Sequence, residues 1–455
     1  MSNHFASSFL KLSCVALAGA VAVTADASDN YWIGGSSGSI DEPANWSEGM
    51  APVYDNRNNN ILVFTNSVSS TPKEHLYATH IRVADDCEVS IGGGGSNRFF
   101  LNGDQVEGVF REAVAEVGSN ATLTLKPQFL GMYGWSGART TLIKRGSGLM
   151  TFYDCVEDFT DIRVEEGCLW FRGTSDTVCT IGASCKYLIT ICDGARVEWL
   201  STSSFDNRMA FQVDEGGVLN ARGRSDTIGA ICGAGLVSNG VFRLTLYNGP
   251  HMFSGTVSNA TVDLNKAISG KSATTDDQFG FVIGSARAFA DERATLSINA
   301  SSAISAPSSP EKCCVRFAPD IGTFYVGEFA GSAVHPIWLA DTDGNAVTMR
   351  VHVASAPYVC GPTNPNQRGC LLYDRNQTFD ARLGAGADLG AVGGATVTLG
   401  PNAEINPDAV LRFNEGTTLN LGGRTVTVRR FVGGGKWTNG KLIRTDAPGL
   451  TVVIR

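Results

Sequence analysis

Short apolar runs separated by glycine turns recur along this chain, and two stretches repeat the same order of elements. Residues 142–173 read LIKRGSGLMTFYDCVEDFTDIRVEEGCLWFRG, and residues 228–264 read IGAICGAGLVSNGVFRLTLYNGPHMFSGTVSNATVDL. Each stretch gives an apolar pair, a G-x-G turn, a β-type run, an aromatic residue and a second β-type run. Units of this kind bury their apolar faces only by stacking on their neighbours. The pattern therefore predicts an elongated β-solenoid.

The same pattern continues outside the two clear repeats. Residues 118–125, GSNATLTL, give a turn followed by strict alternation, which is typical of a half-buried strand. Asn239-Gly240 and Asn439-Gly440 do not separate two long alternating runs, so parallel stacking is favoured over hairpins. The segment 266–380 is the least regular part. Its alanine-rich piece, 284–310, has the composition for one short helix.

Composition agrees with many tight turns and excludes one class of partner. The chain has 53 Gly but only 15 Pro among 455 residues, which suits turns between short strands rather than disorder. Its net charge of −8 argues against nonspecific nucleic-acid binding, which needs clustered Lys and Arg. Lys11, an apolar run and the small-residue site Ala25-Asp26-Ala27 together predict a secretory signal peptide. No later stretch is long and apolar enough to span a bilayer.

The cysteines bear on possible disulfides and metal sites. Eleven of the 12 cysteines follow the predicted cleavage site, and export permits disulfides. Cys360 and Cys370 flank the loop GPTNPNQRG and are the best candidate bridge. The alternative is that most cysteines are small apolar residues stacked inside the coils. The adjacent pair Cys313-Cys314 has no nearby His and the chain has no C-x-x-C, so no metal site is predicted.

The repeat unit resembles a known group. Leu142, Lys144, Gly146, Gly148 and Thr151 match the first half of the autotransporter-associated β-strand repeat. The second copy departs more, because an isoleucine stands in the place of the lysine. The resemblance implies an exported or cell-surface protein with the pectin-lyase-like shape, a right-handed parallel β-helix. It implies no particular activity.

We therefore expect an all-β chain with a single right-handed parallel β-helix and loop insertions. The predicted parts are a signal peptide (1–27), an N-terminal cap and first coil (28–76), a β-helix with two clear repeats (77–265), irregular coils with loop insertions (266–380) and C-terminal β-helix coils (381–455). Trp32 and Trp46 bracket a Gly/Ser turn in the predicted cap, where a solenoid needs a covered first edge.

The candidate chemistry is weak. Asp154, Asp158 and Asp161 cluster in the first repeat and are the only alternative catalytic set; they suit acid/base work on a glycosidic bond or Ca²⁺ binding, but also a solvated turn. ADTDGNAV, residues 340–347, imitates the start of a Ca²⁺ loop but lacks the later Glu and flanking helices. Arg222, Arg224 and Asp226 read as a surface pattern.

The residues thus favour a non-enzymatic exported protein, either a stalk or an adhesin that contacts extracellular polysaccharide or surface proteins. Five aromatic residues are candidate stacking platforms, or else pack over the coils: Trp135, Trp170, Trp199, Trp338 and Tyr373. One alternative is a polysaccharide lyase or hydrolase. Another is a subunit of a larger surface array, which the odd cysteine count favours. No cofactor is expected, with Ca²⁺ as the alternative.

Overall fold

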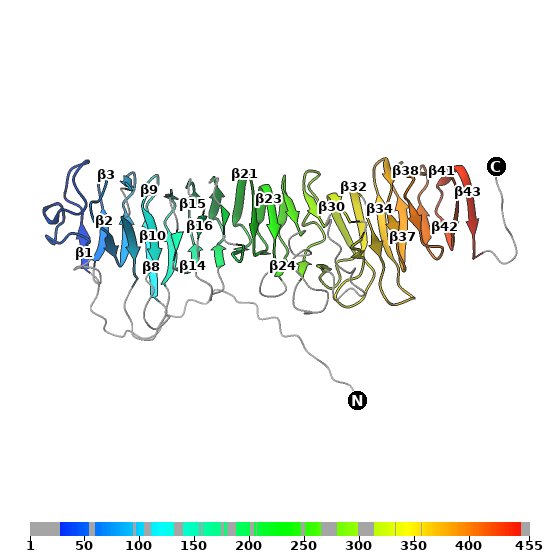
Figure 1. The fold of residues 1–455 in the computed structure, drawn as a ribbon, viewed down its shortest axis with the longest axis horizontal. Helices are drawn as coiled ribbons and strands as arrows, with labels where there is room; N and C mark the ends of the chain where they lie inside the picture. Colours follow the sequence, from blue (N-terminus) through cyan, green and yellow to red (C-terminus); the bar gives the residue numbers. More distant parts are fainter. Residues whose placement is uncertain are drawn as a thin grey trace, which may run out of the picture.

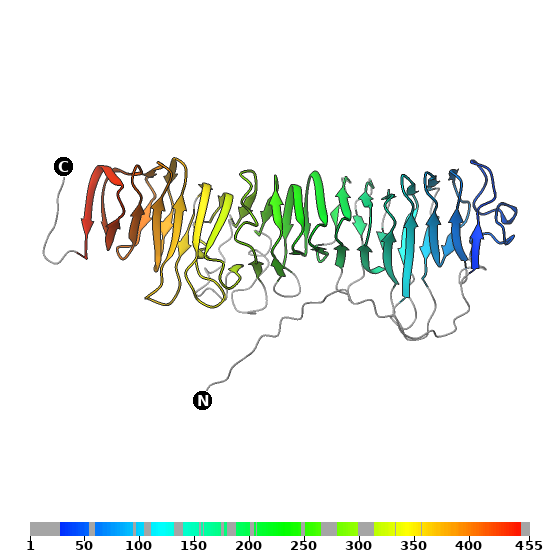
Figure 2. The same cartoon turned by 180° about the vertical axis from the view of Figure 1, so that it is seen from behind.

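The molecule is elongated, and its strands follow one another along the long axis in chain order (Figure 1); Figure 2 shows the same arrangement from behind. The computed structural model describes residues 28–53, 60–93, 97–103, 111–131, 140–153, 156–157, 159–173, 177–179, 188–200, 204–205, 207–246, 251–264, 280–298, 314–332, 334–355 and 357–446. Within these ranges the only helix is the 3-10 helix η1 (Pro43–Asn45), which confirms the all-β class.

Two long parallel sheets run along the molecule. The first has 12 strands: β1 (Ser28–Tyr31), β2 (Asn60–Phe64), β5 (His80–Val83), β8 (Arg111–Val117), β11 (Thr140–Arg145), β14 (Phe159–Val164), β17 (Leu188–Ile191), β20 (Ala210–Val213), β22 (Ala230–Gly233), β24 (His251–Phe253), β27 (Phe281–Ile283) and β29 (Val315–Phe317). The second comprises β3 (Val68–Ser70), β6 (Glu88–Ile91), β9 (Thr122–Leu125), β12 (Leu149–Phe152), β15 (Cys168–Phe171), β18 (Arg196–Trp199), β21 (Val218–Ile228), β23 (Leu236–Leu244), β25 (Thr256–Ser258), β26 (Thr261–Asp263), β28 (Thr295–Ser297), β30 (Thr323–Ala330), β32 (Thr348–Ser355), β34 (Gly369–Tyr373), β37 (Ala387–Ala391), β40 (Val410–Phe413) and β42 (Arg430–Val432).

Smaller parallel sheets complete the chain. Near the N-terminus they comprise β4 (Leu76–Ala78), β7 (Arg98–Leu101), β10 (Gln128–Gly131) and β13 (Val156–Glu157), then β16 (Thr177–Cys179) and β19 (Ser204–Phe205). Near the C-terminus one comprises β31 (Ile337–Trp338), β33 (Val359–Cys360), β36 (Arg382–Leu383) and β39 (Glu404–Ile405), and another β35 (Gln377–Phe379), β38 (Thr396–Leu399), β41 (Thr418–Val428) and β43 (Lys436–Arg444).

We call one set of successive strands, one from each sheet, a tier. A strand pairs in parallel with the strand one tier further along, as β11 does with β14 and β30 with β32. Within the strands, paired residues of neighbouring tiers lie between 16 residues apart in sequence, for Arg224 with Gly240, and 34 apart, for Val89 with Leu123. Parallel strands need such long connections, whereas hairpins need only two residues.

The two Asn-Gly pairs therefore do not form hairpins, as expected. Asn239 and Asn439 lie within β23 and β43 and adopt positive φ values of 57° and 52°. Each occupies a bend in its strand, where an asparagine tolerates the left-handed conformation better than most residues. Each also donates a side-chain hydrogen bond of 3.2 Å, to Asn220 and Asn420 respectively, so the same bend occurs twice along the chain.

Alternation of apolar and polar residues places the core between the sheets. In β9, Leu123 and Leu125 are buried while Thr122 and Thr124 are half-exposed, which confirms the strand predicted from GSNATLTL. A single apolar cluster extends from Trp32 to Leu442. Within it, Phe129 lies 5.5 Å from Phe99 and 5.1 Å from Phe152 between ring centroids, so aromatic rings stack from tier to tier.

The irregular region contains no helix in its described part. The segment 284–298 forms turns and then β28, so the short helix expected in the alanine-rich piece is absent over these residues. Here Ala288, Phe289 and Ala294 are buried against the neighbouring tiers. Tertiary packing has overridden helix propensity, which is a weak preference on its own. The predicted signal peptide, 1–27, lies outside the described residues, and the other predicted boundaries stay predictions.

Lys144 occupies an unusual position for a lysine. Its side chain is fully buried, and its ammonium group donates to the backbone carbonyls of Arg145 (3.1 Å), Gly146 and Glu166 (3.0 Å). The third carbonyl belongs to the next tier. Burial lowers the pKa of Lys144 to about 8, which still leaves the ammonium mostly protonated at pH 7. The lysine of the repeat motif thus holds a glycine turn against its neighbour.

We expect Lys144→Met to lower the free energy of unfolding by about 2 kcal/mol at pH 7, because three carbonyls lose a charged donor and this loss outweighs the recovered desolvation cost. The pKa of Lys144 is lower in the folded than in the unfolded chain. The contribution of Lys144 to the free energy of unfolding therefore increases as the pH is raised from about 8 to 10.5. Urea unfolding at pH 7 and 10 measures both effects. Lys126→Met, at an exposed position, is the control; a stabilised Lys144→Met protein would contradict the prediction.

Candidate functional site

The three candidate catalytic carboxylates do not form a site in the described part of the chain. Asp154 and Asp158 lie outside the described residues. Asp161 is half-buried on β14, and its pKa is raised by burial, although a backbone hydrogen bond from Leu188 on β17 opposes the shift. Its carboxylate thus contacts the sheet itself. A catalytic or Ca²⁺-binding role for the three stays a prediction.

The sequence that imitates a Ca²⁺ loop forms a closed turn. Asp341 is only 4% exposed, and its carboxylate accepts hydrogen bonds from the backbone amides of Asp343 (3.0 Å), Asn345 (2.8 Å) and Asp320 (3.1 Å). An Asp that accepts from amides two and four residues on forms a common turn. Within the described ranges, no group of three or more His, Cys, Asp and Glu residues is placed to hold a metal ion.

The prediction that Arg222, Arg224 and Asp226 form a surface pattern is wrong for Asp226. Asp226 is only 7% exposed, and it accepts hydrogen bonds from the backbone amides of Phe205 and Thr227. Burial raises the pKa of its carboxyl to about 6. Arg222 does reach the surface, but it pairs with the buried Glu198 at 2.7 Å and not with Asp226. A bend at Arg222 and Gly223, which both adopt positive φ, interrupts the alternation along β21, and after this bend the Asp226 side chain faces inward.

The predicted disulfide joins residues that lie on different sheets. Cys360 is on β33 and Cys370 on β34; both are buried, and the structure contains both as thiols. Burial raises the pKa of the Cys370 thiol to about 12. Since the thiolate is the attacking species in disulfide formation, oxidation of folded Cys370 is disfavoured. The bridge stays a prediction.

The aromatic residues considered as stacking platforms mostly pack inward. Trp199 and Tyr373 are buried, with 3% and 0% of their surface exposed. Trp170 and Trp338 are half-buried, and Trp135 lies outside the described residues. The alternative interpretation, that these rings pack within or over the tiers, is confirmed for Trp199 and Tyr373.

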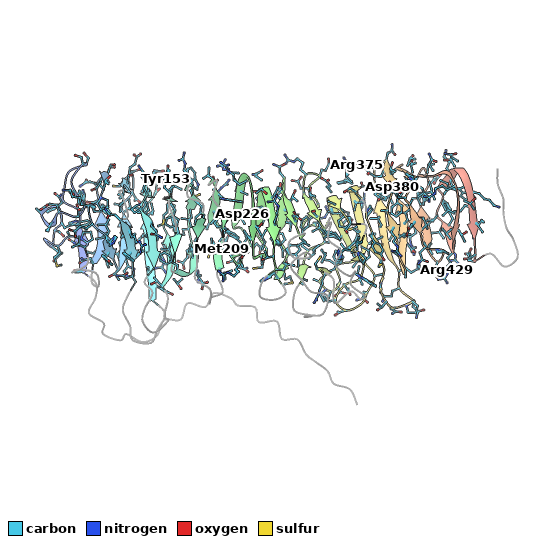
Figure 3. The ribbon with its side chains drawn as sticks, viewed as in Figure 1. Tyr153, Met209, Asp226, Arg375, Asp380 and Arg429 are labelled. Atoms are coloured by element: carbon cyan, nitrogen blue, oxygen red, sulfur yellow. The ribbon has the colours of Figure 1, made fainter. Side chains whose placement is uncertain are left out.

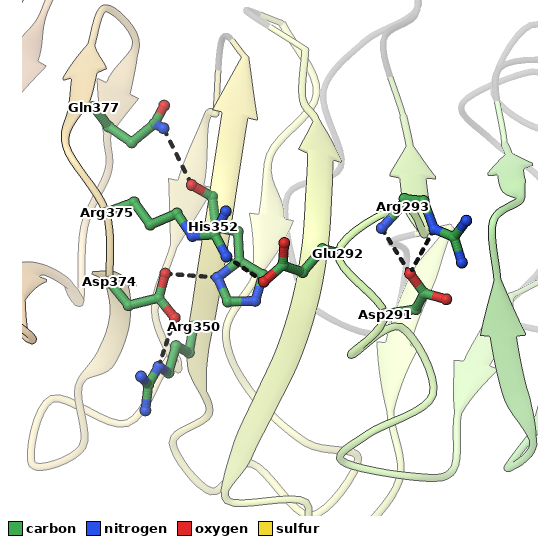
Figure 4. Close-up of polar contacts among 8 residues, drawn as sticks. All are labelled: Asp291, Glu292, Arg293, Arg350, His352, Asp374, Arg375 and Gln377. Atoms are coloured by element: carbon green, nitrogen blue, oxygen red, sulfur yellow. Dashed lines mark hydrogen bonds and ion pairs between the residues drawn. The ribbon is translucent and has the colours of Figure 1, made fainter.

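A different set of residues forms a polar hollow of about 290 Å³ on the second sheet. Its charged and aromatic lining comes from four consecutive tiers and consists of Arg287, Tyr325, Arg350, His352 and Asp374. Figure 4 shows the polar contacts at this place, and Figure 3 shows its neighbour Arg375 on the upper edge of the molecule.

Strand alternation explains why these side chains converge. On β32, Met349 and Val351 point into the core, and Arg350 and His352 therefore point outward. Arg350 pairs in register with Tyr325 on β30, and Val351 with Tyr373, the last residue of β34. The next residue, Asp374, consequently lies beside His352.

Asp374 links the two basic side chains. Its carboxylate accepts a hydrogen bond from Arg350 Nε at 3.0 Å through one oxygen and contacts His352 Nδ1 at 2.7 Å through the other. The Asp374 side chain is only 8% exposed, whereas those of His352 and Arg350 are 25% and 37% exposed. A carboxylate on Nδ1 fixes the tautomer that leaves Nε2 as the unprotonated nitrogen of the neutral ring.

Two guanidinium groups lie against the ring of Tyr325. The Arg287 guanidinium carbon lies 4.7 Å from the centre of the Tyr325 ring, and that of Arg350 lies 5.7 Å from it. Cation–π contacts of this kind orient a cation without neutralising it. In the part of the chain that the structure describes, Arg287 forms no ion pair, so its charge faces the hollow.

A second ion pair borders the hollow. Arg375 pairs with Glu292, which is 83 residues earlier in the sequence, and Gln377 donates to the His352 carbonyl at 3.1 Å (Figure 4). These contacts connect the irregular segment 285–293 to the tiers that follow. The arrangement is a basic, hydrogen-bonding hollow suited to an anionic group and, through His352, to proton transfer.

Sequence reasoning missed this set because its members are far apart in the chain. His352 and Asp374 are 22 residues apart and Arg350 and Asp374 24 apart, close to the spacing between neighbouring tiers. That spacing is the signal that brings such residues together. Comparisons with known protein families, with curated proteins and with solved structures gave no match. No helix among the described residues is long and apolar enough to cross a membrane.

Proposed function

We propose that the chain is an exported protein whose sheets form one right-handed parallel β-helix, and that it acts as a stalk or adhesin outside the cell. One observation carries the proposal: a single core cluster extends from Trp32 to Leu442, with strands in chain order along one axis. A parallel strand that follows a crossover in the same sheet is nearly always reached by a right-handed connection, which favours this hand.

Further support comes from the sequence. The Lys144 motif resembles the autotransporter-associated repeat, and the signal-like N-terminus favours export. A long stack of tiers presents a continuous lateral surface, which suits contact with an extended ligand such as a polysaccharide.

Cleavage of polysaccharide is a second candidate, favoured by the contact between His352 and Asp374. An imidazole held at Nδ1 by a carboxylate can act as a general base through Nε2. On an acidic sugar, Nε2 would take the proton next to the carboxylate, the C–H electron pair would form a double bond, and the leaving sugar oxygen would depart with its bonding pair and take a proton from water.

One incubation tests both functions. Purified protein is mixed with a panel of acidic and neutral polysaccharides, with Ca²⁺ present, and two quantities are measured: protein remaining in solution and new reducing or unsaturated chain ends. We expect depletion of the protein by at least one insoluble polysaccharide without new chain ends. New ends that disappear in His352→Gln protein would instead assign cleavage. If the protein is not depleted and no new chain ends form, the adhesin is contradicted and a stalk or array component is left.

A further inference from the structure

The hollow around His352 lies at a bend that is shared by several tiers. Three to five tiers before His352 this bend is marked by asparagines: Asn239 donates to Asn220 at 3.2 Å, and Asn259 donates to Asn239 at 2.9 Å. Asn239 and Asn259 both have positive φ, 57° and 49°. A row of side-chain amides therefore runs along the molecule, from tier to tier.

The row continues through the irregular segment. Ser258, the residue before Asn259, donates its hydroxyl to Asp291, and Asp291 also accepts from the Arg293 amide at 2.8 Å. These hydrogen bonds lower the pKa of Asp291, so its carboxylate stays charged. The turn 291–293 thus occupies the tier directly after Asn259.

In the next tier the bend lies at a glycine. Gly327 lies between Val326 and Glu328, which pair with Val351 and Val353 and so place Gly327 beside His352. A Cβ atom on Gly327 would lie 2.1 Å from the Asp291 carbonyl oxygen, so only glycine allows this close approach. The bend therefore passes from the asparagines through Asp291 and Gly327 to His352 and Asp374.

A second hollow, of about 600 Å³, lies over the asparagine part of the bend. Its polar lining includes Arg222, Asn239, Asn259 and Arg293. Arg293 is 69% exposed and belongs to the same segment as Arg287, which lines the first hollow. From the tier of Arg222 to the tier of Asp374 there are six strand spacings, or about 29 Å at roughly 4.8 Å each.

The residues along this bend combine positively charged groups with carboxylates and amides. Guanidinium groups of Arg222, Arg287 and Arg293 lie at its surface, and carboxylates and amides lie between them. Arg222 pairs with Glu198 and Arg293 with Asp291, whereas Arg287 forms no ion pair with any described residue. A phosphodiester polymer would meet repulsion from Asp291 and Asp374, because nucleic-acid binding depends on dense uncompensated cations. A sugar polymer with carboxylates uses both kinds of group: its carboxylates accept from arginine, and its hydroxyls donate to carboxylate and amide oxygens.

We propose that the bend from Arg222 to Asp374 is a binding track for an extended, carboxylate-bearing polysaccharide, anchored at Arg287 and Arg350. The inference rests on the proposed function as an extracellular adhesin and names the class of its ligand. Arg287 is the sharpest test residue, because it is exposed, stacks on Tyr325 and forms no ion pair with any described residue.

The experiment measures the affinity of purified protein for immobilised polygalacturonate and for the same polymer after reduction of its carboxylates to alcohols. We expect Arg287→Gln to weaken binding to polygalacturonate about tenfold, as for the loss of one charge-assisted contact, and Arg287→Lys to restore part of it. Arg429→Gln is the matched control, since Arg429 is also exposed and lies on the opposite edge from Arg375 (Figure 3). Its affinity should stay within about twofold of the unmodified protein.

Three results would overturn the inference. They are equal binding of the reduced polymer, equal loss of affinity in Arg287→Gln and Arg429→Gln, and equal or tighter binding of a DNA duplex. Retention by a neutral polysaccharide together with failure to bind polygalacturonate would reject the track but keep the adhesin. Failure to bind any polysaccharide would reject both. Thermal unfolding of each variant confirms that the substitutions act at the surface.

Discussion

Replacing Trp46 with alanine is expected to lower the local stability of the N-terminal end by about 3–4 kcal/mol. Trp46 is 1% exposed, and its ring centroid lies 5.3 Å from that of Trp32 and 5.6 Å from that of Phe64. Its indole N–H donates to the Ile40 carbonyl at 2.8 Å. The substitution thus removes a buried ring that covers the end of the core and leaves that carbonyl without its donor.

Hydrogen exchange measures this effect better than a global unfolding curve, because stacked tiers open locally. Amides of residues 28–53 should exchange about 100- to 1,000-fold faster in Trp46→Ala, while those of β37 and β40 stay unchanged. Ile33→Ala removes a 62% exposed apolar side chain nearby and is the control. Uniform loss of protection along the whole chain would show that Trp46 does not act as a cap residue.

Asp388→Ala is expected to cost about 3–5 kcal/mol, because it leaves two arginines facing a buried site without their partner. Asp388 is fully buried on β37; it pairs with Arg368 Nε at 2.6 Å through one oxygen and with Arg412 at 2.8 Å through the other. It also accepts from the Val410 amide at 2.9 Å. One carboxylate therefore connects three consecutive tiers.

Urea unfolding of the C-terminal tiers, followed by hydrogen exchange of β34, β37 and β40, measures the effect of Asp388→Ala. The matched control is Glu404→Ala, which breaks the pair between Glu404 and Arg382 at 3.3 Å, with side chains 69% and 54% exposed. That exposed pair should contribute less than about 1 kcal/mol. Similar losses in the two variants would show that burial does not strengthen the Asp388 contacts.

The strands were predictable where the sequence alternates and the tiers are short. The runs in residues 142–173 correspond to β11, β12, β14 and β15, because period-two alternation and glycine turns are local properties. The parallel pairing also followed from local signals, since neither Asn-Gly pair joins two long alternating runs.

The candidate site was not predictable in the same way. His352 lies beside Asp374 only because β32 and β34 pair in one particular register. The number of residues between neighbouring tiers varies from 16 to 34, so the sequence does not state which residues become neighbours. The inward side chain of Asp226 illustrates the same difficulty, because its face depends on a bend within β21.

The tiers differ in their number of residues but not in height, and this determines how insertions affect the length of the molecule. The tier that leads from Val89 to Leu123 uses 34 residues and the one from Arg224 to Gly240 uses 16, yet each advances the stack by one strand spacing, about 4.8 Å. Additional residues within a tier therefore widen the molecule and do not lengthen it. Insertions can build or remodel a lateral contact surface at one level while the distance between the two ends stays constant.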